Sequence, residues 1–188
     1  MKILSSSEQI QEFLGQTPLQ SASIRVTRAC NLRCEQCYSF SGNKAKNELS
    51  LAEVKRIIDE LEALGVIRLF FTGGEPFIRK DIMDILEYSN SKKFAMYIST
   101  NGTLVDQETI RRLESLEHLK TFQVSIDGTQ QLHDSIRGKN GAFEKAFKTL
   151  KNAKRILKNT KITSVLTLMK KNANDVENVL RIFLKLNI

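Results

Sequence analysis

The sequence contains few of the features that mark membrane-spanning, secreted or disulfide-stabilised proteins. No apolar run approaches the roughly 20 residues that a membrane span requires. The N-terminal stretch Met1–Ser7 has too short an apolar run for a secretory signal peptide. The chain has only three cysteines, an odd number that does not suit a disulfide framework. Clustered thiols without an export signal predict a protein of the reducing cytoplasm with no membrane partner.

The sequence also lacks the marks of a nucleic-acid-binding surface, although its formal net charge is +8. The excess of lysine is greatest within residues 143–161, where apolar residues recur at helical spacing. Most of these lysines therefore fall on the solvent-facing side of a predicted helix. No aromatic residues are interleaved with the basic ones, as a base-stacking surface would require. We do not expect nucleic acid as a partner, and attraction of an acidic peptide is the weaker alternative.

All three cysteines lie within one stretch of eight residues, Cys30-Asn-Leu-Arg-Cys34-Glu-Gln-Cys37. Three thiolates are too few for a structural zinc site, which normally has four protein ligands. They suit a 4Fe–4S cluster in which one iron has no protein ligand and can bind a substrate or cofactor. Two alternatives remain, namely a zinc site completed by His118 or His133, and cysteines that are simply buried and bind no metal.

Short β-type runs alternate with helical patterns along the chain. The predicted strands are Ser23–Thr27, Val66–Thr72, Phe94–Thr100, Thr121–Ile126 and Lys161–Met169. Four of the predicted helices begin after Ser50, near Asp81, after Asp106 and after Asn174, and the remaining one carries the lysine-rich face with an apolar stripe from Phe143 to Leu157. The first of them starts with a capping box, and Gly65 is expected to end it. The run Val66–Phe71 is nearly all apolar, which predicts a strand covered on both faces. The alternation predicts an α/β fold with a parallel sheet.

Polar and glycine-rich motifs follow the predicted strands, so they should meet at the carboxyl edge of the sheet. They read Thr72-Gly-Gly-Glu-Pro76, Ser99-Thr-Asn-Gly102 and Ser125-Ile-Asp-Gly128. Two adjacent glycines allow a ligand to approach the backbone closely, and Glu75 offers an acceptor for an ammonium group. Taken singly these are ordinary turn sequences, and their occurrence after successive strands is what points to a binding site.

These motifs together resemble those of the radical S-adenosylmethionine (SAM) superfamily, from about Ile24 to the C-terminus. The cysteine spacing with Tyr38, followed by Gly73-Gly-Glu-Pro76, carries the resemblance. The motifs at Ser99–Gly102, Ser125–Gly128, His133-Asp134 and Arg137-Gly138 resemble the branch that often has a C-terminal SPASM or twitch extension. That branch includes peptide- and protein-modifying maturases, sulfatase-maturing enzymes and relatives that act on haem precursors.

The resemblance implies a role for each matching residue. Cluster ligands would be Cys30, Cys34 and Cys37. The methionine ammonium of SAM would be received, largely through backbone carbonyls, by Gly73, Gly74 and Glu75. The ribose and methionine parts would lie near Ser99 and Asn101, and the carboxylate near Ser125 and Arg137. The position before the third cysteine is commonly aromatic in the superfamily, and here it is Gln36. Contacts with the adenine would then depend more on the backbone and on Tyr38.

The resemblance further implies an enzyme that uses a 4Fe–4S cluster and SAM. One-electron cleavage of SAM would yield methionine and a 5′-deoxyadenosyl radical, which abstracts hydrogen from a peptide, protein or tetrapyrrole-type substrate. An electron donor such as flavodoxin or ferredoxin would be a partner. The alternative is a non-catalytic iron–sulfur or metal-binding module. The implied fold is a partial (βα)6 barrel, of which five βα units are present. We expect a lead-in segment at residues 1–22 and a core domain at residues 23–188 that is incomplete at its C-terminus.

Overall fold

The computed structural model describes residues 19–188, which form one open parallel sheet with helices packed against it. Its strands are β1 (Ser21–Arg25), β2 (Arg68–Thr72), β3 (Ala95–Thr100), β4 (Leu119–Ser125) and β5 (Lys161–Val165). They lie in the order β1-β2-β3-β4-β5, and every neighbouring pair is parallel. The predicted α/β class and the five parallel strands are confirmed, and the sheet does not close into a barrel.

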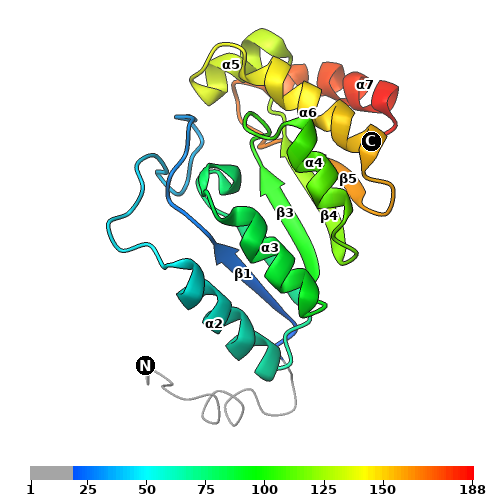
Figure 1. Cartoon of the computed structure of the whole chain (residues 1–188). Coiled ribbons are helices and arrows are strands. Elements are labelled where there is room, and N and C mark those ends of the chain that lie inside the picture. The colour runs from blue at the N-terminus through cyan, green and yellow to red at the C-terminus, as the bar shows by residue number, and fades with distance from the viewer. Residues whose placement is uncertain (1–18) are drawn as a thin grey trace.

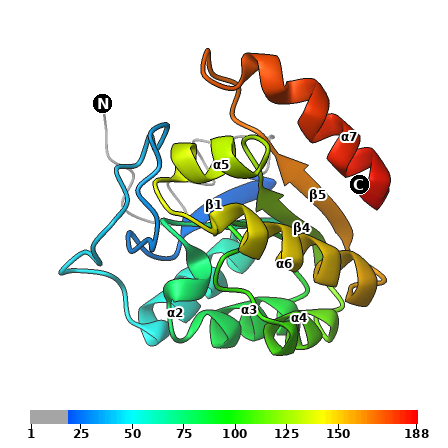
Figure 2. The same ribbon diagram turned by 90° about the horizontal axis from the view of Figure 1, so that it is seen from above.

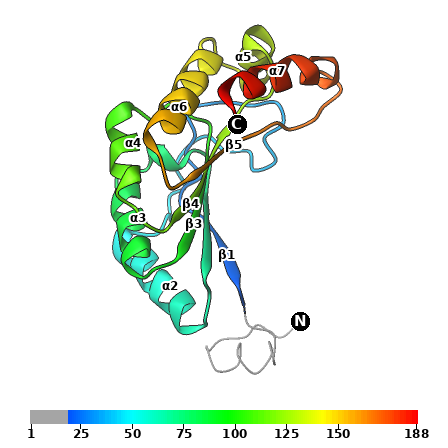
Figure 3. The same cartoon turned by 90° about the vertical axis from the view of Figure 1, so that its right-hand side faces the viewer.

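The helices connect successive strands in the manner of βα units (Figure 1). They are α2 (Leu51–Ala63), α3 (Ile82–Ser91), α4 (Gln107–Glu114), α5 (Gln130–Arg137), α6 (Ala142–Ile156) and α7 (Val176–Leu186), with short 3₁₀ turns at Pro76–Ile78 and Ala173–Asp175. Figure 3 shows α2, α3 and α4 on the same side of the sheet. Among the described residues, no helix is both long and apolar enough to cross a membrane.

Local sequence signals account for the boundaries of α2. The Ser50 hydroxyl oxygen accepts a hydrogen bond from the Glu53 backbone N–H, and the Glu53 carboxylate accepts one from the Ser50 backbone N–H. This is the predicted capping box, which satisfies N–H groups that have no partner within the helix. At the other end Gly65 has φ +77°, a conformation that glycine adopts without the steric cost of a Cβ. Both predicted ends of this helix are confirmed.

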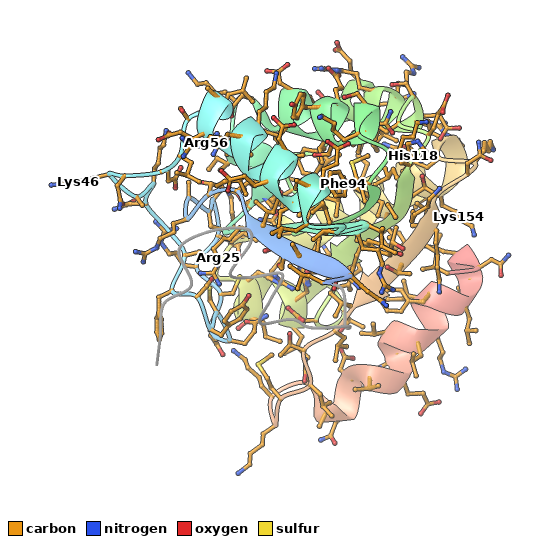
Figure 4. The ribbon with its side chains drawn as sticks, turned by 90° about the horizontal axis from the view of Figure 1, so that it is seen from below. Arg25, Lys46, Arg56, Phe94, His118 and Lys154 are labelled. Atoms are coloured by element: carbon orange, nitrogen blue, oxygen red, sulfur yellow. The ribbon has the colours of Figure 1, made fainter. Side chains whose placement is uncertain are left out.

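Strand β2 is buried on one face only, which corrects the prediction for Val66–Phe71. Leu69 and Phe71 are fully buried against the helices, whereas Phe70 between them is 37% exposed. On the open face the Phe70 ring stacks on Tyr97 of the next strand, with ring centroids 4.6 Å apart. The apolar side chain of Phe70 within this run is therefore explained by its stacking on Tyr97. It does not reflect a second layer of helices, among the described residues, that covers this face of β2. Figure 4 shows the sheet with its side chains and labels Phe94, which is 2% exposed.

Most strand boundaries shift by one or two residues from the prediction, and three differences matter for the site. Strand β1 begins at Ser21, inside the predicted lead-in of residues 1–22, whose first 18 residues lie outside the described part of the chain. Strand β5 ends at Val165 and not at Met169, because the Thr167 and Met169 backbone N–H groups donate to the side chains of Asp127 and Asn172 instead of a neighbouring strand. Helix α5 was not predicted, because its sequence carries a short and interrupted apolar pattern.

Candidate cofactor-binding site

The cysteine loop and the carboxyl ends of the strands enclose a cavity of about 180 Å³. Its lining includes nine of the predicted site residues: Cys30, Cys34, Cys37, Tyr38, Gly73, Gly74, Asn101, Ser125 and Arg137. Leu32, Gln36, Ser39, Ser41 and Thr167 complete the wall. A larger hollow of about 420 Å³ lies between the β3–α4 turn and α6, but no cysteine lines it. The chemistry of the lining, not the size of the hollow, identifies the smaller cavity as the candidate site.

The cysteine loop is held on two sides by backbone hydrogen bonds. The Cys30 N–H donates to Gly42 O at 2.9 Å, which fastens the start of the loop to the chain that follows it. The Glu35 N–H donates to Ile136 O at 3.0 Å, which fastens the middle of the loop to α5. Figure 2 shows α5 beside the loop that follows β1. Farther along, Lys46 lies at the outer tip of this loop (Figure 4). These hydrogen bonds position the cysteines relative to α5 and to the chain that follows the loop.

The three thiols have different surroundings. Burial raises the pKa of Cys30, and Asn101 Nδ2 lies 3.9 Å from its sulfur. Burial also raises the pKa of Cys34, although Arg137 Nη1, 3.8 Å from that sulfur, opposes the shift. Partial burial alone would raise the pKa of Cys37 as well, but hydrogen bonds from Ser39 and Ser41 lower it. Cys37 is thus the thiol whose anionic form the protein stabilises most.

The arrangement of the thiols bears on which metal they can hold. Within residues 19–188, no three His, Cys, Asp or Glu side chains are arranged as ligands of a single ion. Thiolates of a 4Fe–4S cluster each bind a different iron, and three of them leave one iron without a protein ligand. Neither His118 nor His133 lines the cavity, so the structure does not bring the predicted fourth zinc ligand to the thiols. The donor set therefore fits the cluster.

The two glycines after β2 lie against the backbone that leads into the cysteine loop. The Gly74 N–H donates to Thr27 O and the Glu75 N–H to Ala29 O, both at 2.8 Å. A Cβ built on Gly74 would fall onto the Ala29 carbonyl oxygen and lie 2.7 Å from Arg28 O. A Cβ on Gly73 would lie 2.8 Å from Thr27 O. Glycine is thus required here for the approach of two backbone segments, and the same segment also lines the cavity.

Glu75 is placed differently from its neighbours, because it is fully buried and does not line the cavity. Its carboxylate accepts hydrogen bonds from the Thr100 hydroxyl (2.7 Å), the Asn101 N–H (2.7 Å) and the Phe77 N–H (3.1 Å). Burial raises the pKa of this carboxyl, and the hydrogen bonds from Thr100, Asn101 and Phe77 oppose the shift. The side chain holds the turn after β3 in place, so the backbone of this motif is the part that can face a ligand.

The other predicted residues divide into two groups. Asn101 and Ser125 line the cavity at the ends of β3 and β4, and Tyr38 lines it although 82% of Tyr38 is exposed. The Asn101 amide is fixed by a 3.0 Å hydrogen bond to Asn31 Oδ1. Ser99 does not line the cavity, and its hydroxyl donates to Gln123 Oε1 at 3.0 Å within the sheet. The structure therefore brings Asn101, Ser125 and Tyr38 to the cavity that the thiols line, whereas Ser99 does not line it.

Arg137 forms a buried ion pair with Asp127. Its Nη2 lies 2.6 Å from Asp127 Oδ2, with 11% of the Arg137 side chain and none of the Asp127 side chain exposed. The Asp127 backbone N–H donates to His133 Nδ1, and its carbonyl accepts from Asn172 Nδ2. Sequence reasoning treated Ser125-Ile-Asp-Gly128 as a turn motif and assigned no role to Asp127. The His133-Asp134 and Arg137-Gly138 motifs, which follow Asp127 in the sequence, were the signal from which its role could have been predicted.

His133 makes the stability of the chain depend on pH. Burial, and then the charge of Arg137, lower the pKa of His133 to about 4. His133 is therefore neutral in the folded state, while the unfolded chain binds a proton at this side chain below its ordinary pKa of 6.5. We expect this group to reduce the free energy of unfolding by about 2 kcal/mol between about pH 7.5 and about pH 5. Urea denaturation of the metal-free chain at both pH values measures the loss.

His133→Gln should remove this part of the pH dependence, whereas His118→Gln, which changes the other histidine, should retain it. Equal pH dependence in the wild-type chain and His133→Gln would show that His133 is not held neutral by the fold.

Comparison with known proteins agrees with this geometry. The sequence model of the Radical SAM superfamily matches residues 24–183. The chain is 38% identical over 152 residues to Fe-coproporphyrin III synthase of Methanosarcina barkeri, covering 80% of this chain and 37% of that protein. It is also 38% identical over 128 residues to mycofactocin maturase MftC of Mycobacterium tuberculosis, covering 68% of this chain and 32% of that protein. The chain thus spans about a third of the length of these curated relatives.

A solved structure shares the fold at low sequence identity. The crystal structure of Streptococcus suis SuiB bound to S-adenosylmethionine matches with a TM-score of 0.78 and 20% identity, over 100% of this chain and 46% of SuiB. The superfamily match covers most of the sequence, and the relatives include maturases of the SPASM/twitch type to which the motifs pointed. The chain belongs to the radical SAM superfamily, whose enzymes use a 4Fe–4S cluster and SAM as cofactors.

Proposed function

We propose that the chain holds a 4Fe–4S cluster through Cys30, Cys34 and Cys37 and forms the SAM-binding core of a radical SAM enzyme. The observation that carries this proposal is a cavity lined by all three thiols and by residues from the ends of β2, β3 and β4. Three thiolates leave one iron of a cubane open, which suits a cofactor that binds the metal directly. When bound, the reduced cluster and SAM supply a 5′-deoxyadenosyl radical that abstracts hydrogen from the substrate.

The residues of the chain would bind and orient SAM. The backbone at Gly73, Gly74 and Glu75 would accept hydrogen bonds from the methionine ammonium, since carbonyl oxygens there can lie close to a ligand. Ser125 and Arg137 would bind the carboxylate. Asn101 would contact the ribose or methionine part, and Tyr38 the adenine. Ser99, which is bonded to Gln123, would act only indirectly on the ribose side. These contacts position the cofactor, while the cofactor carries the chemistry.

The names of the relatives support a proposal for the substrate class. The most similar relatives include a maturase, MftC, and an Fe-coproporphyrin III synthase, so we propose a peptide, protein or tetrapyrrole-type substrate. An electron donor such as flavodoxin or ferredoxin would reduce the cluster. We place the protein in the cytoplasm, where reduced thiols and such carriers are available.

The proposal is tested by anaerobic reconstitution with iron and sulfide, followed by incubation with SAM and dithionite. We expect reductive cleavage of SAM, detected as 5′-deoxyadenosine by chromatography. A matched sample without reductant should give none. A chain that binds the cluster and SAM but releases no 5′-deoxyadenosine would instead be the non-catalytic iron–sulfur module. A chain that binds neither cofactor would overturn the proposal.

A further inference from the structure

We propose that Asp127 is a positioning residue that orients both Gln36 and Arg137 at the wall of the cofactor cavity, and that Gln36 forms a polar contact with SAM. The inference rests on the proposed function, because it concerns the same cavity. Gln36 occupies the position that is commonly aromatic in the superfamily, and Asp127 had no role in the sequence-based assignment.

One carboxylate oxygen of Asp127, Oδ2, accepts hydrogen bonds from the side chains of both Gln36 and Arg137. Gln36 Nε2 donates to Asp127 Oδ2 at 2.6 Å, and Arg137 Nη2 donates to the same oxygen at 2.6 Å. Asp127 Oδ1 accepts from the Thr167 N–H at 2.9 Å, so the carboxylate is held from its other side as well. Asp127 is fully buried, and charge-assisted hydrogen bonds of this kind are strong and geometrically specific. Rotation of Arg137 away from the carboxylate would leave a buried charge without compensation, and rotation of Gln36 would remove one of the hydrogen bonds that the carboxylate accepts.

The orientation of the Gln36 amide follows from this contact. An ionised carboxylate only accepts hydrogen bonds, so the amide must present its nitrogen to Asp127 and its oxygen elsewhere. That oxygen, Oε1, is buried and has no partner within residues 19–188, and the same holds for Arg137 Nε. Both residues line the cavity. Two residues that line the cavity, Gln36 and Arg137, therefore carry one unpaired acceptor and one unpaired donor. A small rotation of these side chains towards the cavity would pair them with a ligand that carries both kinds of group, as SAM does.

The same carboxylate also affects the electrostatics at the thiols. Arg137 Nη1 lies 3.8 Å from Cys34 Sγ, so the positive charge of the guanidinium is close to a cluster ligand. The negative charge of Asp127 balances it. Removal of that negative charge would leave the positive charge uncompensated and favour the more negative, reduced form of a bound cluster.

The test uses the reconstituted full chain and four variants. Two quantities are measured, namely the SAM dissociation constant and the midpoint potential of the cluster. Asp127→Asn should weaken SAM binding at least about tenfold, the cost of a lost charge-assisted contact, and should raise the potential. Gln36→Leu, which has similar size and no charge, should weaken SAM binding about fivefold and leave the potential unchanged. Ser89→Ala removes a buried hydrogen bond on α3, outside the cavity lining, and should change neither quantity.

The double variant Asp127→Asn/Arg137→Gln removes both buried charges. We expect it to return the potential towards that of the wild-type chain while SAM binding stays weak, an outcome that a purely structural role of Asp127 does not produce. Unchanged SAM affinity in Gln36→Leu would overturn the contact. Unchanged SAM affinity in folded Asp127→Asn would overturn the positioning role, and an unmoved potential in that variant would overturn the electrostatic effect on the cluster.

A readout without cofactors separates this inference from the proposed function. In the metal-free chain, Asp127→Asn should speed hydrogen exchange within residues 34–37, because the Gln36 anchor is lost. If the wild-type chain binds no cluster, the proposed function fails while this measurement still decides whether Asp127 orders the loop. Unchanged exchange in the variant would count against Asp127 whatever the cofactor results.

Discussion

Replacement of any one of the three cysteines by alanine is expected to abolish the iron–sulfur cluster. Anaerobically reconstituted wild-type protein should contain about four irons per chain, and Cys34→Ala should contain almost none. The chain has no fourth cysteine that could take over as ligand. A cubane held by two thiolates would expose two irons to solvent, and metal sites with an incomplete ligand set lose most of their affinity. Iron and sulfide analysis together with the visible absorption spectrum measures the loss.

The control is Asn43→Ala, an exposed position in the chain that follows the same loop. This variant should retain the full iron content, because Asn43 does not line the cavity. Tetrahedral zinc in both as-isolated and reconstituted protein would contradict the assignment and restore the zinc alternative. Full iron content in Cys34→Ala would show that Cys34 is not a ligand.

Gly74→Val is expected to disrupt the local fold and, with it, the cysteine loop. The sequence alone predicts that this change would impair SAM binding more than folding, because the side chain would intrude where the ligand approaches. The structure corrects this reasoning, since the Cβ itself would collide with the backbone of Arg28 and Ala29. Relief of such a clash requires backbone shifts, so we expect the free energy of unfolding to fall by about 3 kcal/mol.

Two further variants test whether the clash at this position begins at Cβ. Gly74→Ala should destabilise the chain nearly as much as valine, because the clash begins at Cβ. Gly42→Ala is the matched control in the same region, since its Cβ would meet only the movable end of the Arg33 side chain, at 3.0 Å. Thermal melts of the metal-free proteins measure all three. A Gly74→Ala variant as stable as the wild-type chain, with weakened SAM binding alone, would favour the ligand-clash explanation.

The features that the sequence determined by itself are local ones. The spacing of Cys30, Cys34 and Cys37 sets a tight loop, because only a few residues separate the thiols. The capping box at Ser50 and the glycine at Gly65 define α2 through contacts within one turn of helix. Alternating strand and helix periods are sufficient to predict a parallel sheet, and with it the edge at which the motifs meet.

The partners of individual side chains were decided only by the tertiary structure. The bond between Gln36 and Asp127 joins residues 91 positions apart, and the contact between Arg137 and Cys34 joins residues 103 positions apart. Glu75 is adjacent to two glycines that line the cavity, yet its carboxylate turns inward to Thr100 and Asn101. Such choices depend on which buried polar groups find partners once the strands have packed. Spacing along the chain identifies the groups that reach the cavity edge, but packing decides which of them remain free to bind a ligand.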